Sequence, residues 1–130
     1  IGQYDGEVSP VAVHAETLYL SMSLGAGASH ELDVAQEQVA IYVVSGKVGI
    51  DGQEVKPGEM AVLAKSRVTL SAASACRLMV IGGEDVGHRE IYWNFVHSSK
   101  ARIEQAKQDW RDMKFERVPG DDEFIPLPGA

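Results

Sequence analysis

Short apolar runs separated by turn residues most constrain how this 130-residue chain can fold. Apolar and polar residues alternate along 17–24, the period-2 pattern of a strand with one buried face. Further apolar runs occupy 39–44, 60–63 and 78–81, and Val68 and Leu70 alternate with polar residues. Asp51-Gly52 lies between two such runs, and this dipeptide tolerates the positive φ angles of a tight hairpin. Many short strands with Gly-rich turns predict an antiparallel sandwich or barrel.

The run from Val39 to Val44 is apolar on both faces of a strand. This pattern predicts a central strand that is covered on each side. Ser45-Gly46 then turns the chain, and Pro57-Gly58 predicts another turn before the next strand.

The hydrophobic period changes near residue 98. Ser98 or Ser99 is suited to cap a helix, and four residues recur at helical spacing after it: Ile103, Ala106, Trp110 and Met113. We therefore expect one amphipathic helix from about Ser99 to Lys114. Three prolines prevent regular structure between Val118 and Pro128, but the apolar residues there predict a tail that packs along the barrel or a partner.

Several motifs occur together in one order along the chain. They are Ser9-Pro10, Tyr42-Val43-Val44-Ser45-Gly46, Gly82-Gly83-Glu84, Tyr92-Trp93-Asn94-Phe95, Asp109-Trp110 and Pro119-Gly120-Asp121. This series resembles the second barrel of pirin-like proteins, which carry two cupin barrels on one chain. The resemblance implies an all-β fold: an antiparallel cupin (jelly-roll type) barrel or sandwich with one C-terminal helix and an extended proline-containing tail. We expect a barrel over 1–97, with a helix and tail over 98–130 packed on it as part of the same domain.

The cupin resemblance also implies where a metal would be held. A working cupin site needs three His and one Glu, a donor set that suits Fe(II), Mn(II), Cu(II) or Ni(II). The four corresponding positions hold His30, Leu32, Val39 and Thr69. Apolar side chains have no lone pair to donate, so we expect no metal, no other cofactor and no catalytic residue. The leading interpretation is a non-metal cupin domain that serves as a structural or recognition module.

Two alternatives remain open at this point. A barrel interior can enclose one small ligand, and such a ligand pocket could be lined by Leu20, Met22, Val39, Ile41 and Thr69, with His30 at the rim. The pirin resemblance also invites a metal-dependent oxygenase similar to quercetin 2,3-dioxygenase, although the missing ligands argue against it.

The aromatic residues near the C-terminus suggest a contact surface. Apolar residues dense enough to pack a core or interface include Trp93, Phe95, Phe124 and Ile125. We expect these to be covered either by a second copy in a homodimer or by a missing N-terminal cupin barrel.

Composition limits the remaining possibilities. The net charge of −7 argues against binding to nucleic acid, because clustered Lys and Arg supply that affinity. No apolar run reaches the length of a membrane helix. Cys76 is the only cysteine, so the chain has no internal disulfide, which suits a reducing compartment; we expect the cytoplasm.

Overall fold

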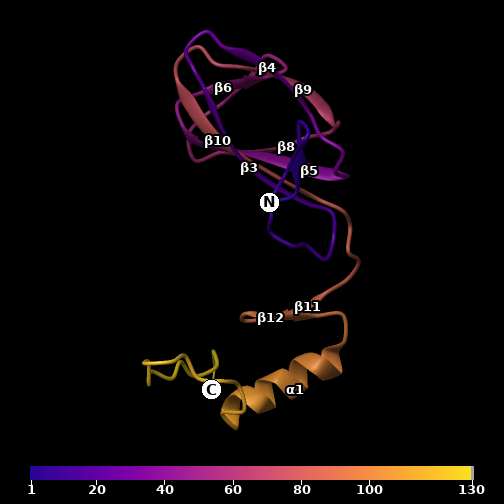
Figure 1. Cartoon of the computed structure of the whole chain (residues 1–130), viewed down its shortest axis with the longest axis vertical. Helices are drawn as coiled ribbons and strands as arrows, with labels where there is room; N and C mark the ends of the chain where they lie inside the picture. Colours follow the sequence, from indigo (N-terminus) through magenta and orange to yellow (C-terminus); the bar gives the residue numbers. More distant parts are fainter. Residues whose placement is uncertain (130) are drawn as a thin grey trace. The chain divides into compact units, whose positions relative to one another are not determined.

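The computed structural model describes residues 1–129 (Figure 1). These residues form two compact units that divide after Val86, and each unit is described here by itself. The first unit contains ten strands: β1 (Gln3–Tyr4), β2 (Glu7–Val8), β3 (Thr17–Leu24), β4 (Ser29–Asp33), β5 (Gln38–Ser45), β6 (Val48–Ile50), β7 (Gln53–Val55), β8 (Met60–Val62), β9 (Arg67–Ser71) and β10 (Cys76–Gly83). The second unit contains β11 (Glu90–Tyr92), β12 (Phe95–His97) and α1 (Lys100–Arg111). The division therefore falls before the expected boundary at 97, because β11 and β12 pair with each other rather than with barrel strands.

Two four-stranded sheets make up most of the first unit. One has the strand order β3-β10-β5-β8 and the other β4-β9-β6-β7, and every strand pairing in them is antiparallel. The expected antiparallel architecture is confirmed, including the central place of β5 between β10 and β8. A short hairpin of β1 and β2 precedes the sheets, and the Ile1 amino group donates to the Tyr19 carbonyl on β3 at 2.8 Å.

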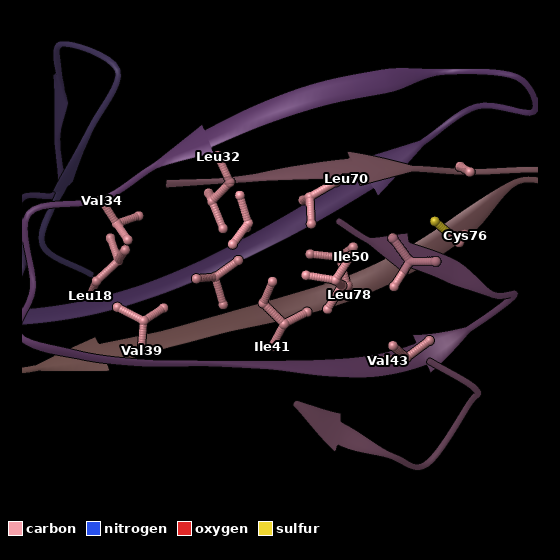
Figure 2. Packing of buried hydrophobic residues seen from close by; sticks show 14 residues of the cluster. Leu18, Leu32, Val34, Val39, Ile41, Val43, Ile50, Leu70, Cys76 and Leu78 are labelled. Atoms are coloured by element: carbon pink, nitrogen blue, oxygen red, sulfur yellow. The ribbon is translucent and has the colours of Figure 1, made fainter. Parts of the chain in front are cut away.

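The core of this unit is built from alternate residues of both sheets. Figure 2 shows these side chains pointing toward one another between the strands. Leu32 and Leu70 of one sheet and Ile41 and Leu78 of the other are fully removed from solvent. Burying each such side chain contributes about 1.5–3 kcal/mol, so this cluster supplies the main driving force for folding.

The turns follow the sequence expectation. Asp51 and Gly52 have φ angles of 48° and 84°, as a hairpin turn between β6 and β7 requires. Gly46, which follows β5, has a φ of 69°, and a Cβ added there would lie 2.7 Å from the Cβ of Cys76. This turn therefore needs glycine both for its backbone conformation and for the space it leaves.

Gly46→Ala is expected to destabilise the protein more than Gly58→Ala. Both glycines have positive φ, but a Cβ at Gly58 would meet no atom within 4 Å. Both variants place alanine in a backbone conformation with positive φ, which costs each of them folding free energy. Only in Gly46→Ala does the added Cβ also clash with its neighbours, which costs about 1–3 kcal/mol more. Chemical denaturation of both variants measures the difference, and equal free energies of unfolding would contradict this description of the turn.

The second unit consists of a hairpin, a helix and an extended tail. Trp93 has a φ of 54°, and it turns the chain tightly between β11 and β12. Helix α1 contacts both strands and ends at Arg111, earlier than the expected Lys114. Met113 has a φ of 55°, and the Lys114 amide donates to the Asp109 carbonyl at 2.9 Å, which closes the helix C-terminus. Within residues 1–129, no helix has the length and apolar character needed to cross a membrane.

Candidate functional site

The positions of the cupin metal ligands lie in very different surroundings. Leu32 on β4 is completely buried and Val39 on β5 is 5% exposed, and both belong to the core cluster. Thr69 on β9 corrects the expectation that it faces the interior: it is exposed, whereas its neighbours Val68 and Leu70 are buried. Because strand faces alternate, Thr69 must point away from the core.

His30 is the one imidazole among the four expected ligand positions. It lies on β4, two residues before Leu32 on the same face of the strand, and is half-buried. The Tyr4 hydroxyl and His30 Nε2 are 2.8 Å apart and share a hydrogen bond. Burial, and then the nearby carboxylates of Asp5 and Asp33, raise the pKa of Tyr4 above its usual value. A neutral phenol therefore joins the N-terminal hairpin to β4.

The residues expected to line a ligand pocket divide into three groups. Val39 and Ile41 lie inside the core, and Leu20 and Met22 on β3 are half-buried and pack against it. His30 is bonded to Tyr4, and Thr69 faces outward. The structure thus places four of the six in or against the packed core, and it does not bring Thr69 to them.

A first-row metal does not fit this set of residues. Such an ion needs several nitrogen or oxygen donors that converge on one point. Two of the four positions carry buried hydrocarbon, one carries an outward-facing hydroxyl, and His30 is left as a single imidazole. Within residues 1–129, no group of three or more His, Cys, Asp or Glu side chains comes together so as to hold a metal ion.

The C-terminal unit contains a cluster of aromatic rings. Trp110 of α1 lies 5.1 Å from Trp93 and 6.2 Å from Phe95, measured between ring centroids. Phe124 of the tail stacks on Trp110 at 5.8 Å, and Trp110 Nε1 donates to the Ile125 carbonyl at 2.9 Å. These contacts bring the four expected interface residues (Trp93, Phe95, Phe124 and Ile125) into one neighbourhood. The sequence interpretation missed the central role of Trp110, although its helical spacing to Ile103 was visible.

Part of this cluster remains open to solvent. A cavity of about 220 Å³ lies beside it, walled by Trp110, Phe115, Phe124 and Ile125 and bordered by carboxylates of the tail. Phe124 and Ile125 are 45% and 57% exposed. The cluster therefore leaves an apolar surface uncovered in the single chain.

Comparison with known proteins agrees with this architecture. Residues 19–116 match the family described as the pirin C-terminal cupin domain. The chain belongs to this family. A pirin-like protein of Caulobacter vibrioides is 41% identical over 130 residues, which span 98% of this chain and 45% of that protein.

The names of two further similar proteins include an enzymatic activity. A Pseudomonas aeruginosa protein provisionally named quercetin 2,3-dioxygenase is 28% identical over 121 residues, 90% of this chain and 42% of that protein. The crystal structure of an Acinetobacter baumannii quercetin 2,3-dioxygenase superposes with a TM-score of 0.86 at 20% identity, over all of this chain and 46% of that one. This second similarity establishes the fold alone. The pirin C-terminal cupin domain described here spans less than half the length of these curated relatives.

Tyr4 is a residue that the sequence interpretation overlooked, because nothing in its local pattern links it to His30. Tyr4→Phe is expected to cost about 1 kcal/mol of folding stability by removing that hydrogen bond. Tyr19→Phe, at a tyrosine that is 46% exposed, is the matched control and should change stability little.

The pH dependence gives a second readout of the same bond. Because folding raises the pKa of Tyr4, its contribution is complete below the usual tyrosine pKa and declines as the pH rises through the folded value. The difference between wild type and Tyr4→Phe should therefore narrow above about pH 10. Chemical denaturation at neutral and alkaline pH measures it, and a difference that is absent at neutral pH would contradict the assigned bond.

Proposed function

We propose that this pirin C-terminal cupin domain acts as a non-catalytic structural and recognition module. The observation that carries the proposal is the apolar filling of the barrel at the ligand positions, where Leu32 and Val39 pack with Ile41 in the core. A reacting substrate needs open coordination positions or a polar group within reach. Hydrocarbon packed at these positions offers neither, so recognition falls to the outer surface.

The oxygenase alternative rests on the names of relatives. Those relatives are more than twice as long as this chain, and the matched part covers 42% of the Pseudomonas protein. An activity of the whole relative need not reside in the matched half. The residues of this chain supply one imidazole where a cupin oxygenase needs four ligands.

The small-molecule alternative requires an interior that its own side chains leave open. Val39 and Ile41, two of the expected lining residues, are 5% and 0% exposed as parts of a continuous cluster. Interiors of this kind are packed as densely as organic crystals and exclude ligands of useful size. We therefore favour recognition of a protein surface over capture of a ligand inside the barrel.

The partner we propose is a second barrel, most simply another copy of the chain in a homodimer. Large apolar side chains that remain exposed in the single chain support this, since exposed apolar patches usually mark contact surfaces. A reducing, cytoplasmic setting is part of the same proposal, and the single buried Cys76 is consistent with it.

Metal analysis tests the non-catalytic role. Protein purified without a His tag is expected to carry far less than one iron, nickel, copper or manganese ion per chain, and to leave quercetin unoxidised under air. His30→Ala is the matched variant, and it should not change the metal content because His30 alone does not hold an ion. A near-stoichiometric metal that is lost in His30→Ala would overturn the proposal.

A further inference from the structure

The sheet β3-β10-β5-β8 has an outer face whose side chains point away from the core. The strand register places Tyr19, Ile81, Ala40 and Val62 side by side in one row across the four strands. The next row contains Ser21, Met79, Tyr42 and Met60. We call these eight residues the outer-face patch.

The outer-face patch is uncharged and largely apolar, and it remains open to solvent. Val62 is 79% exposed and Met60 55%, on the edge strand β8, while Tyr19 and Ile81 are 46% and 40% exposed. Arg77 lies in the following row, and its guanidinium donates to the Ser21 hydroxyl at 3.4 Å. The expectation that Val39 to Val44 is covered on both sides is therefore wrong for the single chain, because Val44 is 43% exposed.

The opposite sheet shows what an ordinary solvated face of this unit looks like. The outward residues of β4 and β9 include Glu31, Asp33 and Arg67, which form ion pairs across the strands. Thr69 lies among them and is also exposed. One sheet thus presents charged side chains to water and the other presents Val, Ile, Met and Tyr, so the difference between the two faces is a property of the sequence rather than of sheets in general.

We propose that the outer-face patch is the surface on which a second copy of this chain docks, sheet against sheet. The proposal rests on the recognition role proposed above and names its surface and partner. Two chains that each carry a net charge of −7 repel, so they can approach most closely where neither presents a carboxylate. An uncharged apolar face is also compatible with itself, as a two-fold interface requires.

The size of the patch sets the expected affinity of the dimer. Four strands about 4.8 Å apart give a face roughly 15–20 Å wide. The area that two rows of side chains cover on this face is smaller than the roughly 800 Å² that each partner buries in a standard stable interface. The dimer should therefore be weak, with a dissociation constant in the micromolar range. Aligned packing of two sheets would place the β5 and β10 side chains at its centre.

Sedimentation equilibrium of the purified chain from about 1 to 100 µM tests the proposal. Val62→Lys and Met60→Lys should each weaken dimerisation at least tenfold, because each buries a charge at the contact. Thr69→Lys is the matched control: it makes the same charge change at an exposed strand position on the charged sheet, and it should leave the dissociation constant unchanged. Thermal unfolding of all three variants checks that they are folded, which is expected since all three positions are exposed.

Phe124→Lys distinguishes this surface from the aromatic cluster of the C-terminal unit. Dimerisation that is lost in Val62→Lys and retained in Phe124→Lys and Thr69→Lys supports the outer-face patch. A wild-type chain that stays monomeric, an unchanged dissociation constant in both β8 variants, or a loss confined to Phe124→Lys would overturn it. The metal analysis does not depend on these dimerisation results. The outer-face patch can therefore be disproved without disproving the non-catalytic role, and the reverse also holds.

Discussion

The contact between the inner faces of two four-stranded sheets is the interaction on which the rest of the structure depends. Leu32 and Leu70 from one sheet interlock with Ile41 and Leu78 from the other, and all four are fully buried. No polar or charged side chain of residues 1–129 is buried with them. This contact stabilises the first unit and also fills the space that a metal or substrate would need. The same packing therefore both stabilises the fold and occupies the positions of Leu32 and Val39 with hydrocarbon.

Because side chains fill the interior, a function of this domain is expected at its outer surface. The fold is shared with proteins named as quercetin 2,3-dioxygenases, but a fold does not determine chemistry, which depends on the side chains at the site. His30 keeps an imidazole near the expected position, and its hydrogen bond to Tyr4 gives that imidazole a structural use. The two surfaces that remain distinctive are the outer face of β3-β10-β5-β8 and the aromatic cluster around Trp110.

Strand periodicity predicted much of this architecture because one face of each strand is buried. The alternation along β3, the apolar run of β5 and the Asp51-Gly52 turn all lie where the sequence placed them. Thr69 was misplaced because its position was assigned by correspondence with the cupin ligand positions, whereas alternation with Val68 and Leu70 would have turned it outward. Local alternation reports the side-chain direction directly, and motif spacing assumes that the intervening loops keep their length.

Other features could not be predicted for reasons that are equally local. Trp93 and Met113 adopt positive φ angles at a hairpin turn and a helix end, where glycine or asparagine is the usual signal. The helix therefore appeared longer than it is. The bond between Tyr4 and His30 joins residues 26 positions apart, and no local pattern encodes such a contact.

The central claim is that two of the expected ligand positions, Leu32 and Val39, belong to a packed core, and equilibrium unfolding of Leu32→His with and without Ni(II) tests it most directly. A packed core predicts that the variant loses several kcal/mol of stability, since a polar ring replaces a fully buried leucine. It also predicts that Ni(II) restores none of that loss, because Thr69 faces outward and Val39 donates nothing. A variant that Ni(II) stabilises strongly, through His30 and the new histidine, would contradict the account and reveal a site that still has room for a metal.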